Sequence, residues 1–213
     1  MATYLATVFE RMLPTTPWEK RLVVEPLLAS EPDPKRPAAS IDFHLGTRFS
    51  VPRRRRAVRH DPLSEDERLD IAASELFVAL GEEFVLHPGQ LVLGTTLEWY
   101  RFPADLMAYV VGRSIWGRRG LLVATATAVQ PGSAGTITLE LSNVGEIAVV
   151  LKPGAAIGQL FFHVVADVPP TDFTRVSPFA GAHGPILGHY SRSLSENYLL
   201  GADGNRANAP TRP

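Results

Sequence analysis

The sequence lacks cysteine entirely, and only 8% of its 213 residues are aromatic. A chain without cysteine has no disulfide, no thiolate nucleophile and no cysteine ligand for zinc. It also lacks an apolar run near the roughly 18 residues that a membrane-spanning helix needs. Neither sign of charge is in excess, since 21 lysines and arginines are balanced by 22 aspartates and glutamates. We therefore expect a cytoplasmic protein that binds neither membranes nor nucleic acid.

Turn-forming residues, by contrast, are abundant, with 17 glycines and 18 prolines. Pro-Gly pairs at residues 88–89, 131–132 and 153–154 have the residue order of type II turns. Apolar, β-rich runs lie between and beside these turns, at residues 90–96, 121–129, 136–141, 147–151 and 157–165. Short strands joined by such turns, with no long helical pattern between them, predict an all-β barrel or sandwich.

The two ends of the chain differ from this pattern. Near the N-terminus a short helix is predicted by five apolar residues at helical spacing, Leu5, Val8, Phe9, Met12 and Leu13. Pro14 and Pro17 end that helix. After about residue 170 the strand rhythm is lost and glycine, serine, proline and asparagine dominate. We therefore predict one β domain over residues 1–170 and a partly flexible tail over residues 171–213.

A dense basic cluster consists of Arg53–Arg56 with Arg59 and His60, and an acidic stretch follows it over residues 61–70. The cluster favours a solvated loop, with an interaction surface as the alternative, because arginine clusters suit phosphate. Its acidic neighbours neutralise the cluster, so it does not predict nucleic-acid binding.

The segment 136–143 alternates with a period of two. Ile137, Leu139 and Leu141 share one face of the predicted strand, while Glu140 lies on the other face among hydroxyl side chains. The ordinary interpretation is an exposed strand glutamate. The residues alone do not favour a functional role over this one.

A second polar feature lies at residues 111–120, where Gly112 is followed by Arg113 and Ser114 and then by Arg118 and Arg119. A glycine turn that offers backbone N–H groups, a hydroxyl and arginines can bind an anion. The alternative is a short helical turn with arginines facing solvent.

Taken together, several collinear segments resemble the dCTP deaminase family, within the superfamily that also holds the dUTPases. They are Ser40–Gly46, His87–Glu98, Phe102–Leu106, Gly112–Leu121, Pro131–Gly135, Ile137–Gly145 and Lys152–Leu160. The resemblance runs from roughly residue 20 to residue 166. It implies a distorted β-barrel, or β-clip, of the dUTPase-like type, assembled as a homotrimer with its active sites between subunits.

The resemblance further implies a pyrimidine nucleoside triphosphate as substrate, and hydrolytic deamination of a cytosine nucleotide, dCTP to dUTP plus ammonia. Glu140 would act as general acid and base, while Ser114 and Arg118 would orient the water and the ring. The other implied ligands of the substrate are Arg113, Thr125, Ala126, Thr127, Gln130, Gln159, Tyr190 and Arg192. Mg²⁺ would be bound through the nucleotide phosphates.

Zinc is not expected at this site. Zinc-dependent deaminases need two or three cysteine ligands and a His-x-Glu motif. This chain has no cysteine, and none of its six histidines precedes a glutamate at that spacing. A deaminase built on this chain would therefore use general acid–base catalysis without a metal-activated water.

Three segments depart from the family pattern. Gln130 precedes the Pro-Gly turn where the family has an aspartate, and an amide cannot act as a base. The run over residues 121–129 is about one residue shorter than the family's pocket strand. In the tail, Tyr190 and Arg192 are the nearest equivalents of the family's lid residues.

Two alternatives to the deaminase remain open from the sequence. One is a dUTPase-like nucleotide diphosphatase, which Gln130 disfavours. The other is a non-catalytic regulator that binds pyrimidine nucleotides on the same fold.

Overall fold

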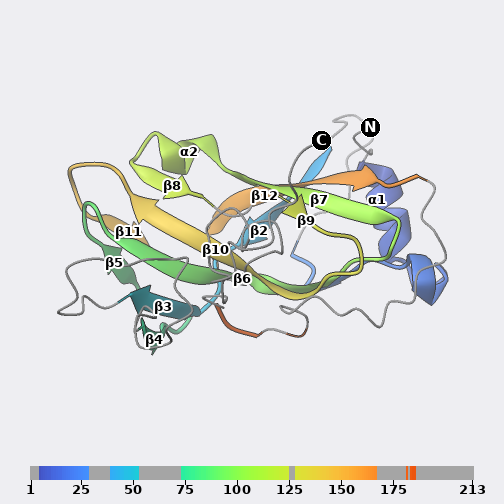
Figure 1. Ribbon diagram of the computed structural model, residues 1–213, viewed down its shortest axis with the longest axis horizontal. Coiled ribbons are helices and arrows are strands. Elements are labelled where there is room, and N and C mark those ends of the chain that lie inside the picture. Colours follow the sequence, from blue (N-terminus) through green and yellow to red (C-terminus); the bar gives the residue numbers. More distant parts are fainter. Residues whose placement is uncertain are drawn as a thin grey trace, which may run out of the picture. The chain divides into compact units, whose positions relative to one another are not determined.

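Figure 1 shows a computed structural model of the protein, which describes residues 5–28, 39–52, 73–124, 128–166, 181 and 183–185. Its helices are α1 (Leu5–Met12), the 3-10 helix η1 (Trp18–Lys20) and α2 (Ser114–Gly117). Its strands are β1 (Val23–Glu25), β2 (Ser40–His44), β3 (Arg48–Pro52), β4 (Ala73–Phe77), β5 (Phe84–Leu86), β6 (Leu91–Arg101), β7 (Leu106–Gly112), β8 (Leu121–Val123), β9 (Ala128–Val129), β10 (Ala134–Asn143), β11 (Val149–Leu151) and β12 (Ala156–Val164).

The strands pair antiparallel in three sheets (Figure 1). The largest has the order β4-β3-β6-β10-β8, with β1 also paired to β6. A second sheet has the order β2-β12-β7-β9, and β11 pairs with β5 in the third. The predicted all-β class and the short N-terminal helix are confirmed. The described strands form three sheets rather than one closed barrel.

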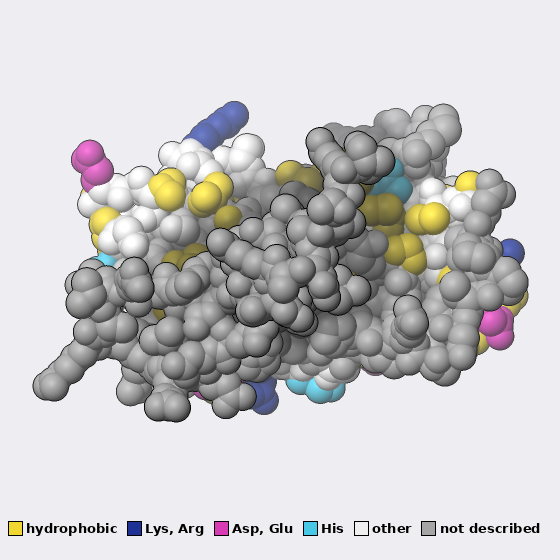
Figure 2. All heavy atoms as spheres, in the orientation of Figure 1, with side chains coloured by type: hydrophobic (Ala, Val, Ile, Leu, Met, Phe, Trp, Pro, Cys, Tyr) yellow, Lys and Arg dark blue, Asp and Glu magenta, His cyan; other side chains and the backbone are white. Residues whose placement is uncertain are grey.

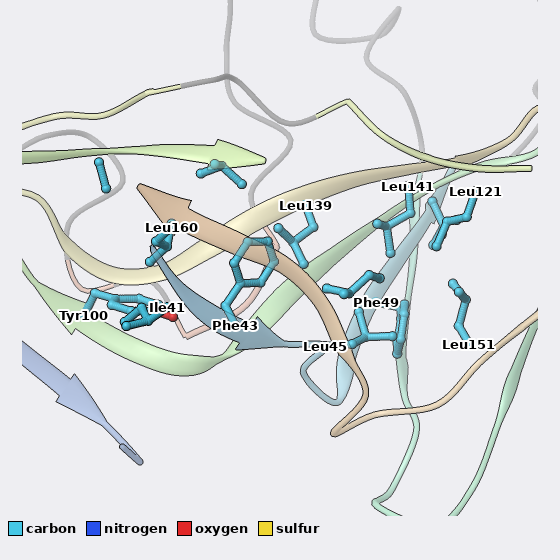
Figure 3. Packing of buried hydrophobic residues seen from close by; sticks show 14 of the residues in the cluster. Ile41, Phe43, Leu45, Phe49, Tyr100, Leu121, Leu139, Leu141, Leu151 and Leu160 are labelled. Atoms are coloured by element: carbon cyan, nitrogen blue, oxygen red, sulfur yellow. The ribbon is translucent and has the colours of Figure 1, made fainter. Parts of the chain in front are cut away.

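The inner faces of the two larger sheets share one hydrophobic core. Leu139 and Leu141 of β10 are fully buried, as are Phe43 of β2 and Leu160 of β12. Figure 3 shows these side chains packed in the same interior. Burying each such side chain contributes about 1.5 to 3 kcal/mol. The period-two pattern predicted for residues 136–142 is confirmed, because the alternate residues Thr138, Glu140 and Ser142 are less buried.

The predicted Pro-Gly turns are present as well. Gly89, Gly132 and Gly154 have φ values of 71°, 77° and 87°, which the third position of a type II turn requires. The apolar run over residues 121–129 differs from the prediction, because it contributes to two strands. β8 pairs with β10 in the largest sheet, whereas β9 pairs with β7 in the four-stranded sheet. The chain therefore changes sheets between Ala124 and Ala128.

The described residues test only some of the predictions about membrane spans, the basic cluster and the tail. None of the described helices is long and apolar enough to cross a membrane. The cluster at residues 53–60 and the acidic stretch at 61–70 lie outside the described residues. The same holds for most of residues 171–213, so the division into a domain and a tail stays a prediction.

Gly158 of β12 lies directly against the ring of the buried Phe43. A Cβ atom at position 158 would approach the Phe43 Cζ atom to 2.1 Å. We expect Gly158→Ala to lower the free energy of unfolding by about 1 to 3 kcal/mol, because the buried ring must move to relieve the overlap. Urea denaturation measures this loss.

Gly117→Ala is the matched control for this substitution. Among the described residues, and outside its chain neighbours and its own helical turn, no atom lies within 4 Å of a Cβ at position 117; alanine is also favoured over glycine in a helix. Gly117→Ala should therefore leave stability unchanged or slightly raised. An equal loss in both variants would show that the contact with Phe43 is not the reason for glycine at position 158.

Candidate functional site

Three neighbouring strands of the four-stranded sheet bring an acid, an amide and an arginine together. Asp42 of β2 lies opposite Gln159 of β12, and Gln159 in turn lies opposite Val111 of β7. Arg113 follows β7 immediately, and its backbone N–H donates to the carbonyl of Ile157 at 3.1 Å. The sheet register thus fixes the backbone of Arg113 next to β12.

Asp42 joins the other two side chains through its two carboxylate oxygens. Arg113 Nη1 donates to Asp42 Oδ2 at 3.1 Å, and Gln159 Nε2 donates to Asp42 Oδ1 at 2.8 Å. The side chains of Arg113 and Asp42 are 39% and 37% exposed. Because a guanidinium has five N–H donors, Arg113 keeps donors that an anion at this surface could use.

The helical turn α2 continues from Arg113. This agrees with the alternative predicted for residues 111–120, a short helical turn whose arginines face solvent, because Ser114, Arg118 and Arg119 are exposed. Figure 2 shows one basic side chain standing out from the surface above α2. Arg113 departs from that interpretation, since its side chain is ion-paired with Asp42. The segment therefore combines one positioned arginine with an exposed hydroxyl and two exposed arginines.

Glu140 lies on β10 between Thr138 and Ser142, opposite Leu93 of β6. Its side chain is half-buried and is directed away from the core that holds Leu139. The carbonyl of Glu140 accepts a hydrogen bond of 2.8 Å from the N–H of Ala124. Ala124, which follows β8, is therefore held beside the backbone of Glu140.

Glu140 and the Asp42–Arg113 pair project outward from two different sheets. Glu140 is on the outer face of the largest sheet, whereas Asp42 and Gln159 hold Arg113 at the outer face of the four-stranded sheet. Among the described residues, no hydrogen bond or ion pair joins Glu140 to Arg113, Ser114 or Arg118. The predicted acid–base group and the predicted phosphate ligand therefore make no direct contact in the described part of one copy.

Of the other predicted substrate ligands, the structure describes only some. Gln130 is exposed, and its carbonyl accepts the N–H of Ser133 at 3.2 Å in the Pro-Gly turn. The predicted pocket residues Thr125, Ala126 and Thr127 lie outside the described residues, as do the predicted tail residues Tyr190 and Arg192. Within the part of the chain that the structure describes, no group of three or more histidine, aspartate or glutamate side chains could hold a metal ion.

Asp42 was not among the site residues predicted from the sequence. Neither was a buried polar pair formed by His44 and Glu98. The carboxylate of Glu98 is only 2% exposed and lies 2.6 Å from His44 Nδ1. The same carboxylate accepts the backbone N–H of His44 at 3.0 Å. Among the described strands β2 pairs with β12 alone, so this bond satisfies an N–H group on the other edge of β2. Residues 40–46 alternate between polar and apolar side chains in the sequence, which predicts that Asp42 and His44 lie on one polar face. This pattern could have identified both residues.

Tyr100, two residues beyond Glu98, carries a buried hydroxyl that has no hydrogen-bond partner among the described residues. Burial, and secondly the negative charge of Glu98, raise the pKa of Tyr100 well above its ordinary value. In the unfolded chain the phenol ionises near pH 10, at about its ordinary pKa. The stability that the neutral phenol contributes is therefore full below about pH 10 and is lost as the pH rises further.

We expect Tyr100→Phe to keep or raise the free energy of unfolding at neutral pH, by up to about 2 kcal/mol, because it removes an unsatisfied buried hydroxyl. The loss of stability between about pH 9 and pH 11 should also become smaller. Chemical denaturation at several pH values measures both effects. Tyr109→Phe, at an exposed tyrosine, is the control that should keep the alkaline loss. A clear destabilisation by Tyr100→Phe would contradict the account.

Comparison with solved structures defines the class of protein to which this fold belongs. A dCTP deaminase from Agrobacterium tumefaciens matches with a TM-score of 0.51 and 21% sequence identity. The match covers 76% of this chain and 48% of that one, so this chain spans about half the length of the solved protein. The mostly β fold is thus shared with a nucleotide deaminase.

Sequence comparison identifies the family. The family described as dCTP deaminase-like matches residues 17–165, well over half of the chain. The dCTP deaminase of Halorubrum lacusprofundi is 47% identical over 170 residues, which cover 78% of this chain and 82% of that protein. A dUMP-forming dCTP deaminase from Halobacterium salinarum is 43% identical over 168 residues, covering 77% and 84%. The chain belongs to the dCTP deaminase-like family, as its sequence motifs predicted.

Proposed function

We propose that this protein hydrolyses the amino group of dCTP, giving dUTP and ammonia. Family membership supports cytosine nucleotide deamination, and relatives at 40–47% identity carry the name dCTP deaminase. The single observation that supports this chemistry most strongly is the position of Glu140. It is a half-buried carboxylate on a regular strand, beside the start of the segment predicted to line the base pocket.

In the proposed reaction Glu140 takes a proton from water, and the resulting hydroxide attacks C4 of the cytosine ring. The proton then passes through the same carboxyl group to the amine, the C4–N bond breaks and ammonia leaves. The proton of the new C4 hydroxyl moves to ring nitrogen N3 as the C4 carbonyl forms, so that one water is consumed for each dUTP formed. Such proton transfer contributes about 10²- to 10⁴-fold to the rate.

The complete site would be formed between copies of the chain in a homotrimer. Glu140 and Arg113 project from different sheets, and no hydrogen bond or ion pair joins them among the described residues of one copy, which supports contributions from two subunits to each site. Arg113 would bind the triphosphate, while Ser114 and Arg118 of the same copy would orient the water and ring held by the neighbouring Glu140. Mg²⁺ would enter with the substrate, bound mainly by phosphate oxygens, and zinc would have no part.

The proposed product is dUTP rather than dUMP, although relatives of both kinds have similar identities to this chain. Release of pyrophosphate from dUTP requires a second activated water. Gln130 stands where the resemblance implies the aspartate that positions such a water, and an amide cannot accept its proton. Deamination is therefore proposed to end at dUTP.

We expect Glu140→Gln to lower kcat for dCTP by at least about 10²-fold, because the amide keeps the shape of the side chain but cannot exchange the proton. Mass spectrometry of the nucleotides, with Mg²⁺ present, separates dCTP, dUTP and dUMP. Glu146→Gln is the matched control, since Glu146 is an exposed glutamate that lies beyond the end of β10. This control should keep full activity.

Each alternative predicts a distinct result in the same assay. Equal activity of Glu140→Gln and the unmodified protein would contradict the assigned role of Glu140. Pyrophosphate release from added dUTP would support the diphosphatase. Tight nucleotide binding without any turnover of cytosine nucleotides would support the non-catalytic regulator.

A further inference from the structure

We infer that Asp42 is a positioning residue, which holds Arg113 and Gln159 in the orientation that receives the substrate phosphates. This inference rests on the proposed function, because it assigns the anion at this surface to a nucleoside triphosphate. It adds a residue that the sequence motifs did not single out. Its basis is the pair of contacts that the Asp42 carboxylate makes across β2, β12 and the end of β7.

Asp42 has a fixed position in the sheet. Its neighbours Ile41 and Phe43 are buried in the core, which directs the Asp42 side chain to the opposite face of β2. Asp42 and Gln159 are register partners, so their side chains emerge side by side on that face. The carboxylate is therefore placed by the backbone of two paired strands and not by a mobile loop.

The contact with Arg113 restricts a long side chain without using up its donors. A free arginine side chain has many rotamers, and a ligand that orders the side chain must overcome part of that rotamer entropy. The one hydrogen bond from Nη1 to Asp42 removes much of that freedom in advance. The remaining N–H groups of the guanidinium are left for a ligand, because they make no other hydrogen bond among the described residues.

The contact with Gln159 fixes a second group. Because Nε2 donates to Asp42 Oδ1 at 2.8 Å, the orientation of the Gln159 amide is set by the carboxylate. Loss of Asp42 would therefore release two predicted substrate ligands at once. The two are positioned as a unit, and the substrate would meet them already in place.

The negative charge of Asp42 could instead weaken nucleotide binding. The direction in which the affinity changes when Asp42 is removed therefore tests the inference. A carboxylate near a triphosphate repels it, since like charges at short range are unfavourable. If repulsion dominated, removal of Asp42 would tighten nucleotide binding. If positioning dominates, as we infer, removal of Asp42 weakens binding although one negative charge has been lost.

The kinetic test compares Asp42→Ala and Asp42→Asn with the unmodified full-length protein. We expect Asp42→Ala to raise KM for dCTP about tenfold, with kcat changed less than about threefold, because a binding contact and not the chemical step is affected. Asp42→Asn should show a smaller rise, since its amide can still bond to both partners if the Gln159 amide rotates. Melting temperatures establish that each variant is folded.

A double-mutant cycle separates positioning from a general structural effect. If Asp42 acts through Arg113 as well as through Gln159, Asp42→Ala should raise the KM of an Arg113→Ala variant by a clearly smaller factor than it raises the KM of the unmodified protein. Glu83→Ala is the matched control, because Glu83 is also the acid of an ion pair, with exposed Lys152 at 3.6 Å. This control should leave KM unchanged. Additive effects of Asp42→Ala and Arg113→Ala would overturn the inference.

Binding of inorganic tripolyphosphate, measured by calorimetry, tests the inference independently of catalysis. Asp42→Ala and Arg113→Ala should each weaken this binding about tenfold, and Glu83→Ala should not. A protein that binds tripolyphosphate in this pattern but deaminates no cytosine nucleotide would contradict the proposed function and keep the inference. Unchanged or tighter binding by both Asp42 variants would overturn the inference, whatever the activity.

Discussion

The hydrophobic core between the two larger sheets is the constraint on which the rest of the molecule depends. β2 and β12 contribute alternate residues to it from one side, and β10 contributes Leu139 and Leu141 from the other. In a strand that buries every second residue, the intervening residues must point outward. The position of Glu140 on one outer face and of Asp42 and Gln159 on the other is therefore a consequence of core packing.

This arrangement has a direct consequence for catalysis. A deaminase needs a proton-transferring group close to the base and cationic groups close to the phosphates. In one copy of this chain the two kinds of group project from different sheets, and no hydrogen bond or ion pair joins them among the described residues. In the proposed homotrimer, the outer face of one copy would meet the outer face of another and bring the two kinds of group together. The alternation of side chains that builds the core would then also place both groups for the proposed site.

The sequence was sufficient for features that depend on local pattern. The period of two over residues 136–142 predicted the faces of β10, and the three Pro-Gly pairs predicted turns with glycines at positive φ. Features that depend on which strands pair could not be predicted from the sequence. Asp42 and Gln159 are 117 residues apart in the chain, and Glu98 is 54 residues from His44. For the same reason the run 121–129 resembled one strand, since periodicity does not reveal that β8 and β9 have partners in different sheets.

The central claim is that Glu140 of one copy and Arg113 of another form one site, and mixing two inactive variants tests it most directly. Glu140→Gln and Arg113→Glu are dissociated together and reassembled in equal amounts. The account predicts that activity returns in the mixture, to about a quarter of the unmodified level, because some sites then combine an intact Glu140 with an intact Arg113 from different copies. If the mixture stays as inactive as either variant alone, although mixed assemblies have formed, the site does not lie between subunits and the account is contradicted.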